Sequence, residues 1–214
     1  MFQVMLNTHN LKVSTNPHML TTSPLMKSVN TTLALAKSHT QDIGDAFIPN
    51  TLNTSKDKYI IVHPNNVSIK GIGDVANSLG GIPLPDDREA YANFLKAIDR
   101  RIKEKKAVVI YPEAHIWPYY TGIRPFPDAS FHYPIKLGVP VFCFTNTYQK
   151  SRCSREPKIV TYVEGPFDPN KDLPLKEQRT DLRDRVYAAM KKNAERSTVE
   201  TIKYIKATPR NNDN

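Results

Sequence analysis

The chain of 214 residues contains little cysteine and no long hydrophobic run. Its two cysteines, Cys143 and Cys153, have neither the spacing of a zinc site nor the pattern of a secreted, disulfide-rich domain. No stretch of about 18 consecutive apolar residues is present, so the sequence predicts no transmembrane helix. The first residues lack the basic and apolar segments with which a secretory signal peptide begins. Together these absences predict a reduced, cytosolic protein.

Acidic residues are also in short supply. Lysine and arginine number 30 against 21 aspartates and glutamates, which gives a formal net charge of +9. A basic surface favours polyanions, so anionic lipid surfaces, phosphorylated substrates and nucleic acids are all candidate partners. The sequence contains no zinc finger, no internal repeat and no aromatic nucleic-acid platform. We therefore expect no nucleic-acid partner and keep a basic nucleic-acid-binding domain as an alternative interpretation.

The order of apolar and helical segments predicts an α/β fold. Helical stretches alternate with short apolar segments near residues 33–38, 59–63, 107–111, 139–145 and 159–163. Such alternation is typical of a largely parallel mixed sheet flanked by helices, and the length suits a single domain. We expect this domain to cover residues 31–206, after a poorly ordered N-terminal segment (residues 1–30) and before a disordered tail (residues 207–214).

The clearest helical pattern covers residues 86–106. Asp86 is the expected N-cap, and Glu89 stands three residues later, as in a capping box. Apolar residues at helical spacing predict one buried stripe, formed by Tyr91, Leu95, Ile98 and Ile102. The opposite face is rich in lysine and arginine, for which a solvated surface is the default explanation.

Three further helices are expected. The first covers residues 65–79 and ends at two glycines. The second is short, over residues 128–137, with Asp128 as its N-cap and Gly138 just after its end. The third is long and begins after Pro174, with a buried side formed by Leu182, Val186 and Met190; it can continue toward Ile205.

The most informative stretch joins two apolar strands, over residues 107–146. The first strand stops at Pro112, where a ladder N–H group is missing, and Glu113 and His115 follow directly. Ligands bind at the carboxyl ends of the strands in open α/β sheets. A carboxylate and an imidazole at this position are therefore candidates for chemistry.

The order of strand, Tyr-Pro-Glu turn, Pro-Phe loop, short helix, Gly-x-Pro and second strand resembles the glycerolipid acyltransferases, which acylate glycerol 3-phosphate or lysophosphatidic acid. The resemblance covers residues 32–166 and includes two further blocks upstream. It implies a glycerol-3-phosphate acyltransferase-like fold. It also implies transfer of a fatty acyl group from acyl-CoA, acyl-carrier protein or acyl phosphate to a hydroxyl, with no metal, no cofactor and no covalent enzyme intermediate.

The first upstream block is a histidine followed by an aspartate. The resemblance implies that His39 removes the proton from the acceptor hydroxyl and that Asp45 fixes its tautomer. Family members have four intervening residues, whereas five intervene here. Gly44 can absorb the extra residue, and Asp42 is the alternative partner. For an isolated pair of this kind, capping of a turn is the ordinary explanation.

The phosphate-binding block departs from the family pattern. Family members show Pro-Glu-Gly-Thr-Arg, in which the Glu organises the site and the remainder holds phosphate. Here Glu113 is retained, but the glycine and the arginine are absent. Because a phosphate needs cations or N–H donors, we expect other residues to take over. The candidates are His115, Arg124, Lys70, Gly81 of the Gly-x-Ile block, and Arg88, which is equally explained as an exposed residue of a first helical turn.

The implied partners are an acyl donor, a glycerol phosphate or lysophospholipid acceptor and an anionic membrane surface. We expect peripheral attachment at the inner face of the membrane, driven by charge. The aromatic residues Trp117, Tyr119 and Tyr120 either pack the loop or line an acyl channel. A catalytically silent homologue that binds anionic lipid surfaces is a further alternative. The identity of the acyl donor, its chain length and the true acceptor stay open.

Overall fold

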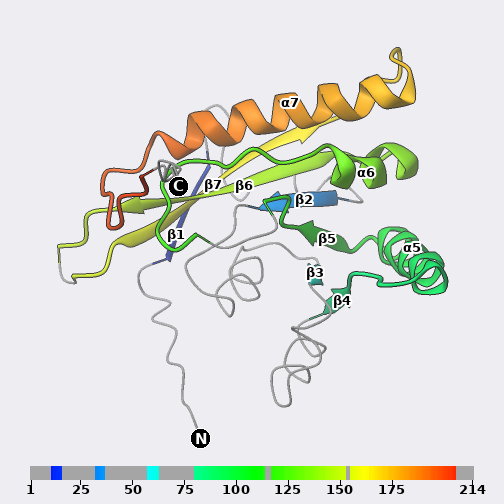
Figure 1. Ribbon diagram of the computed structural model, residues 1–214, viewed down its shortest axis with the longest axis horizontal. Helices are drawn as coiled ribbons and strands as arrows, with labels where there is room; N and C mark the ends of the chain where they lie inside the picture. The colour runs from blue at the N-terminus through cyan, green and yellow to red at the C-terminus, as the bar shows by residue number, and fades with distance from the viewer. Residues whose placement is uncertain are drawn as a thin grey trace, which may run out of the picture.

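The computed structural model describes residues 11–15, 32–36, 57–62, 80–113, 117–152 and 155–205, of which residues 11–15 and 32–36 are described by their backbone alone. Within these ranges the chain forms one mixed sheet of seven strands in the order β1-β7-β6-β2-β5-β3-β4 (Figure 1). The strands are β1 (Leu11–Thr15), β2 (Thr32–Ala36), β3 (Lys58–Val62), β4 (Gly81–Pro83), β5 (Ala107–Ile110), β6 (Val141–Gln149) and β7 (Lys158–Phe167).

The strand directions agree with the fold expected from the sequence. Strands β4, β3, β5, β2 and β6 are parallel to one another. Strand β7 returns antiparallel to β6, and β1 pairs in parallel with β7 at the edge of the sheet. The prediction of a single α/β domain with a largely parallel mixed sheet is therefore confirmed.

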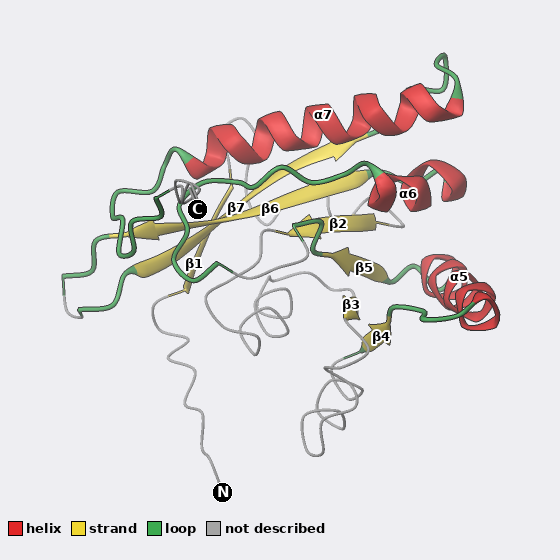
Figure 2. Ribbon diagram, in the orientation of Figure 1, coloured by secondary structure: helices red, strands yellow, loops and turns green. Residues whose placement is uncertain are grey.

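The helices of the described ranges pack on the sheet through one continuous apolar cluster. They are α5 (Arg88–Lys103), the short 3₁₀ helix η2 (Ala129–Phe131), α6 (His132–Leu137) and α7 (Leu175–Ala194). Figure 2 shows α7 lying along β6 and β7, with α6 on the same side of the sheet. Alternate residues of β5 and β6 face this cluster, among them Val108, Ile110, Val141 and Cys143, because successive strand side chains point to opposite faces.

Strand β5 is buried on both faces. Val108 and Ile110 belong to the cluster on the helix side, whereas Val109 packs with Ile60 and Phe142 in a second cluster on the opposite face. All four residues of β5 are buried. A parallel strand covered on both sides reads as a continuous apolar run, which is why the sequence predicts this strand so clearly.

Helix α5 begins one residue later than predicted. Its N-cap is Asp87, whose carboxylate accepts a hydrogen bond from the backbone N of Ala90 at 2.7 Å. The predicted capping box from Asp86 is therefore wrong. The buried row is Phe94, Ile98 and Ile102, spaced four residues apart, while Tyr91 of the predicted stripe is exposed.

Helix α5 also ends earlier than predicted, at Lys103. Lys105 adopts a left-handed backbone conformation (φ +62°), and the backbone N of Lys106 donates to the carbonyl of Arg101 at 2.9 Å. This is the hydrogen-bond pattern that ends many helices, here with lysine at the position that glycine usually occupies. The turn delivers the chain directly into β5.

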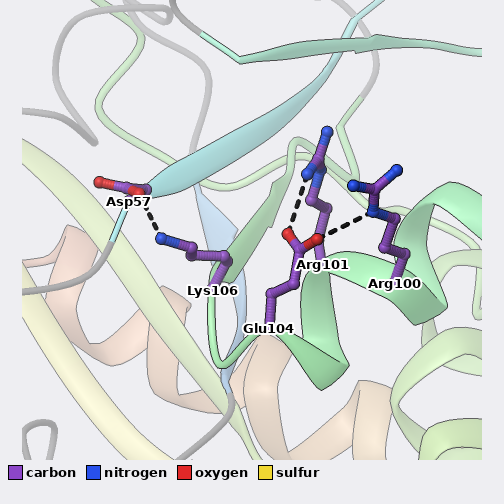
Figure 3. Close-up of polar contacts among 5 residues, drawn as sticks. All are labelled: Asp57, Arg100, Arg101, Glu104 and Lys106. Atoms are coloured by element: carbon purple, nitrogen blue, oxygen red, sulfur yellow. Dashed lines mark hydrogen bonds and ion pairs between the residues drawn. The ribbon is translucent and has the colours of Figure 1, made fainter.

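The basic residues at the end of α5 form ion pairs (Figure 3). Glu104 accepts from Arg100 Nε at 2.8 Å and from Arg101 Nη1 at 2.9 Å, and Lys106 bonds to Asp57, just before β3. These hydrogen bonds and the adjacent positive charges lower the pKa of the Glu104 and Asp57 carboxyls. The two Glu104 pairs are local to the end of α5, whereas the Lys106 bond joins the start of β5 to the start of β3.

The two C-terminal helices follow the predicted pattern in part. Gly138 ends α6 in the left-handed conformation (φ +63°), as expected. Asp128 makes no side-chain capping bond; its carboxylate instead lies 3.5 Å from Nε of Arg179 on α7. On α7, the predicted buried residues Leu182, Val186 and Met190 are all fully buried.

Helix α7 stops at Ala194 and does not continue toward Ile205. After the helix the chain turns back to the sheet, where the backbone N of Thr198 donates to the carbonyl of Tyr148 on β6 at 2.9 Å. Further along this segment, Tyr204 contacts Trp117 and Pro118 in the loop that follows β5. None of the helices within the described ranges combines the length and the hydropathy needed to span a bilayer.

Of the other sequence predictions, some can be compared with the structure and others lie outside the described residues. Residues 1–30 were expected to be poorly ordered, with no strand, yet β1 (Leu11–Thr15) pairs with β7. The predicted helix over residues 65–79, the tail at 207–214 and Cys153 lie outside the described residues. Cys143 is buried on β6 as expected, and burial raises the pKa of its thiol.

Candidate active site

The carboxyl ends of β2 and β5 lie side by side. Leu35 of β2 is paired with Ile110 of β5, so the two strands end at the same level. Strand β2 ends three residues before His39, and β5 ends three residues before Glu113. The chain segments that lead to the predicted base and to the predicted carboxylate therefore leave the sheet from adjacent strands, at the edge where α/β enzymes bind their ligands.

Glu113 is a buried carboxylate, with 7% of its surface exposed. Burying a charged carboxylate is unfavourable unless opposite charge and hydrogen-bond donors accompany it. Arg124 supplies both. Its backbone N donates to Oε2 of Glu113 at 3.2 Å, its Nη2 donates to the carbonyl oxygen of Glu113, and its Nε lies 3.8 Å from Oε2. The structure thus brings together two residues that were selected from the sequence for different roles.

Arg124 is in turn packed on the aromatic loop that follows Glu113. Its guanidinium carbon lies over the ring of Trp117, 4.9 Å from the centroid, in a cation–π contact. Ile123 on one side of Arg124 and Phe126 on the other are buried, and Phe126 stacks on Phe131 at 6.2 Å. The backbone around Arg124 is consequently held by the core of the domain.

The C-terminal segment closes over the same loop. Tyr204 stacks on Trp117 with a centroid distance of 4.9 Å and an interplanar angle of 16°, and its hydroxyl donates to the carbonyl of Pro118 at 2.8 Å. Tyr120 meets both rings edge-on. Tyr119 packs against Tyr148 of β6 at 5.6 Å. These contacts favour loop packing over an acyl channel as the explanation of the aromatic residues.

The remaining predicted site residues are placed apart from this group or outside the described residues. Gly81 begins β4 opposite Ile60, below the carboxyl edge of the sheet. Arg88 is the exposed first residue of α5, which matches its alternative interpretation. The other candidates, which the structure does not describe, are His39, Asp42, Asp45, Lys70 and His115.

Gly80, which precedes Gly81, has a conformational role in this part of the sheet. Its φ of +79° lies in the left-handed region, and a Cβ added there would meet the carbonyl oxygen of Lys58 at 2.8 Å. The carbonyl of Gly80 accepts from the backbone N of Ile60 at 2.9 Å. Gly80 therefore allows β4 to approach β3, and the first glycine of the Gly-Gly-Ile-Pro stretch has a structural reason to be glycine.

The pairing of Glu113 with Arg124 and the contact of Tyr204 with Trp117 were not found from the sequence. Glu113 and Arg124 are separated by a loop without helical or strand periodicity, and Tyr204 stands far along the chain. A buried carboxylate always requires a partner, but several arginines satisfy that requirement equally well in the sequence. Within the described ranges, no group of three or more His, Cys, Asp or Glu side chains is arranged to hold a metal ion.

Comparisons with known proteins identify the family of this chain. The acyltransferase family model matches residues 19–146, a span that contains both the His39 block and Glu113. The chain therefore belongs to the acyltransferase family, and the resemblance to glycerolipid acyltransferases is confirmed. The protein is an acyltransferase.

A solved structure with a similar fold supports the architecture. It is the crystal structure of the 1-acyl-sn-glycerophosphate (LPA) acyltransferase PlsC from Thermotoga maritima, with a TM-score of 0.56 and 16% sequence identity. The similarity covers 88% of this chain and 74% of that chain. No curated protein sequence matches this chain.

Proposed function

We propose that the protein transfers a fatty acyl group from acyl-CoA, acyl-carrier protein or acyl phosphate to a hydroxyl of lysophosphatidic acid, glycerol 3-phosphate or a related lysolipid. The observation that carries this proposal is the match to the acyltransferase family over residues 19–146. The fold shared with a lysophosphatidic acid acyltransferase and the buried Glu113 beyond β5 add support.

The proposed reaction begins at His39. Its neutral imidazole removes the proton of the acceptor hydroxyl, and the hydroxyl oxygen attacks the carbonyl carbon of the acyl donor. When the tetrahedral oxyanion collapses, the bond between the acyl carbon and the donor's sulfur or phosphate oxygen breaks, and the new ester bond to the acceptor remains. The departing thiolate or phosphate takes the proton back from the imidazolium. Asp45 orients the imidazole and stabilises its positive charge. Glu113 organises the site at the adjacent strand end, a role that the side-by-side ends of β2 and β5 support.

We propose that candidates selected from the sequence recognise the acceptor phosphate. His115, Lys70 and Arg88 are the cationic candidates, Arg124 lies beside Glu113, and Gly81 lies in the backbone of β4. A phosphate brought into a partly dry cleft requires opposite charge and N–H donors, and the family's Gly-Thr-Arg is absent here.

The function is tested with a panel of donors and acceptors. Radiolabelled acyl-CoA and acyl-carrier protein are each incubated with lysophosphatidic acid, glycerol 3-phosphate and monoacylglycerol, which differs from lysophosphatidic acid in lacking the phosphate. We expect acylation of a phosphorylated acceptor to exceed that of monoacylglycerol at least about tenfold, the factor that 1.4 kcal/mol of phosphate binding provides.

Three outcomes contradict parts of this proposal. Equal acylation of monoacylglycerol contradicts the proposed preference for a phosphorylated acceptor but not the acyltransferase reaction itself. No turnover with any pair, together with vesicle binding, indicates a silent lipid-binding homologue. A salt-dependent shift of nucleic acid that vesicles do not compete indicates the nucleic-acid-binding alternative.

We further propose that the protein attaches peripherally to the inner face of the membrane through charge. The net charge of +9 supports this, and the exposed apolar side chains of Trp117, Ile202 and Ile205 are available for additional contact with lipid. Ile205 is 82% exposed. Basic residues gain about 1 kcal/mol each near an anionic surface, and salt screens that attraction.

Vesicle flotation measures this attachment. We expect the protein to float with vesicles of phosphatidylglycerol and phosphatidylcholine at low salt, and to be released as the salt concentration rises to about 1 M, where the Debye length falls to about 3 Å. Vesicles of phosphatidylcholine alone are the control and should bind much less. Equal flotation with both vesicle types, or flotation that high salt leaves unchanged, argues against electrostatic attachment.

A further inference from the structure

Arg124 and Glu113 hold each other through both main chain and side chain. The backbone N of Arg124 donates to the side chain of Glu113, while the guanidinium of Arg124 donates to the main-chain carbonyl of Glu113. One residue therefore fixes the carboxylate oxygen Oε2 and also the path of the chain where it leaves β5. We propose that Arg124 is a positioning residue that acts through Glu113, and that Tyr204 supports it through Trp117.

The burial of the pair shows why such a residue is needed. The side chain of Glu113 is 4% exposed and that of Arg124 is 17% exposed, so water solvates neither charge well. In this environment a carboxylate that loses its counter-charge is strongly destabilised, and it turns toward other donors. The orientation of Glu113 therefore depends on Arg124.

The geometry favours a role for Arg124 in orienting Glu113 over a role in binding phosphate. Its positive charge lies 3.8 Å from Oε2 of Glu113, and its guanidinium face lies on Trp117. A guanidinium used in this way is partly neutralised and cannot turn without breaking both contacts. Lysine cannot replace it fully, because an ammonium group lacks the planar fork that binds and stacks at the same time.

Tyr204 extends this arrangement to the C-terminal segment. Its ring stacks on Trp117, and Trp117 makes a cation–π contact with the guanidinium of Arg124. The hydroxyl of Tyr204 donates a hydrogen bond to the carbonyl of Pro118 in the same loop. The segment is attached to the sheet independently, since Thr198 donates to Tyr148 of β6. Tyr204 thus lies on a continuous path of contacts from β6 to Glu113.

The kinetic test rests on the proposed function and compares kcat with KM. For Arg124→Ala we expect kcat to fall at least about tenfold, while KM for lysophosphatidic acid changes less than about threefold, because an interaction that acts in the transition state lowers kcat. The double variant Glu113→Gln/Arg124→Ala should lose no more activity than the worse single variant. Arg124→Lys should recover part of kcat.

Two kinetic results overturn the proposal. A selective rise of KM for the phosphorylated acceptor, with kcat unchanged, makes Arg124 a direct phosphate ligand. Losses that multiply in the double variant show that the two residues act separately. The double variant also removes both charges together, so it remains folded and measurable if Arg124→Ala alone, with its uncompensated carboxylate, does not fold.

A second measurement is independent of any enzymatic activity. Trp117 is the only tryptophan of the chain, so its fluorescence reports this arrangement alone. We expect acrylamide to quench Trp117 more strongly in Arg124→Ala and in Tyr204→Leu than in the natural protein. Tyr91→Leu, an exposed tyrosine on α5, is the matched control and should leave quenching unchanged.

Quenching that stays unchanged in Arg124→Ala and Tyr204→Leu overturns the proposed arrangement. If quenching increases as expected but the natural protein transfers no acyl group to any acceptor, the proposed function fails while the arrangement stands. If both the kinetics and the quenching follow the expectation, Arg124 and Tyr204 act by holding Glu113.

Discussion

Replacing His39 with alanine is expected to lower turnover at least about a hundredfold, the usual scale for the loss of a general base. The thermal midpoint of unfolding should change little. In the natural protein, kcat/KM should rise with pH as the imidazole loses its proton, because only the neutral imidazole accepts a proton. Steady-state kinetics from pH 5 to about pH 9 measure both effects. Near-normal activity of His39→Ala removes this residue from the mechanism.

The partner of His39 is identified by two matched substitutions. Asp45→Asn keeps the size of the side chain and removes its charge, so it should reduce turnover less than loss of the base does. Asp42→Asn is the control three residues earlier. If Asp42→Asn is instead the damaging change, the extra residue between histidine and aspartate is not absorbed at Gly44, and Asp42 is the partner.

The largest expected effect on stability is at Leu182. This side chain is fully buried between α7 and the sheet, in the cluster that contains Val141 and Cys143 of β6. Leu182→Ala should lower the free energy of unfolding by about 2–5 kcal/mol, because it removes buried apolar surface and leaves a cavity. Denaturation by urea, followed by circular dichroism, measures the loss.

Leu175 provides the control for this prediction on the same helix. It is 71% exposed at the first turn of α7, so Leu175→Ala should change the free energy of unfolding by no more than about 0.5 kcal/mol. Similar losses at both positions, or a negligible loss at Leu182, would mean that α7 does not pack on the sheet as described.

The elements that the sequence predicts well are those in which one physical pattern dominates. The four residues of β5 are apolar because both faces are covered, and the buried side of α7 repeats at helical spacing. Gly138 marks the end of α6 because the left-handed conformation there favours glycine. In each case the local pattern and the tertiary structure demand the same residue type.

The elements that were missed depend on contacts between distant segments or on a choice between neighbours. Asp86 and Asp87 are equally good caps in isolation, and the adjacent sequence does not show that the helix is capped by the second. The residues of β1 have no apolar run, and they form a strand because β7 offers an edge. The partner of Glu113 was not predictable for a similar reason, since the loop that carries Arg124 is shaped by buried side chains around it.

The pairing of the first strand with the last has a consequence for how the protein is made. Leu11 of β1 is paired with Ile159 of β7, and Thr32 of β2 with Ala107 of β5. During synthesis on the ribosome, β1 has no partner until nearly the whole chain has emerged. Parallel pairing over such separations is slow, and unpaired strand edges promote aggregation in the interval. The yield of folded protein in a foreign host should therefore depend more on translation rate and chaperone supply than on the stability of the finished domain.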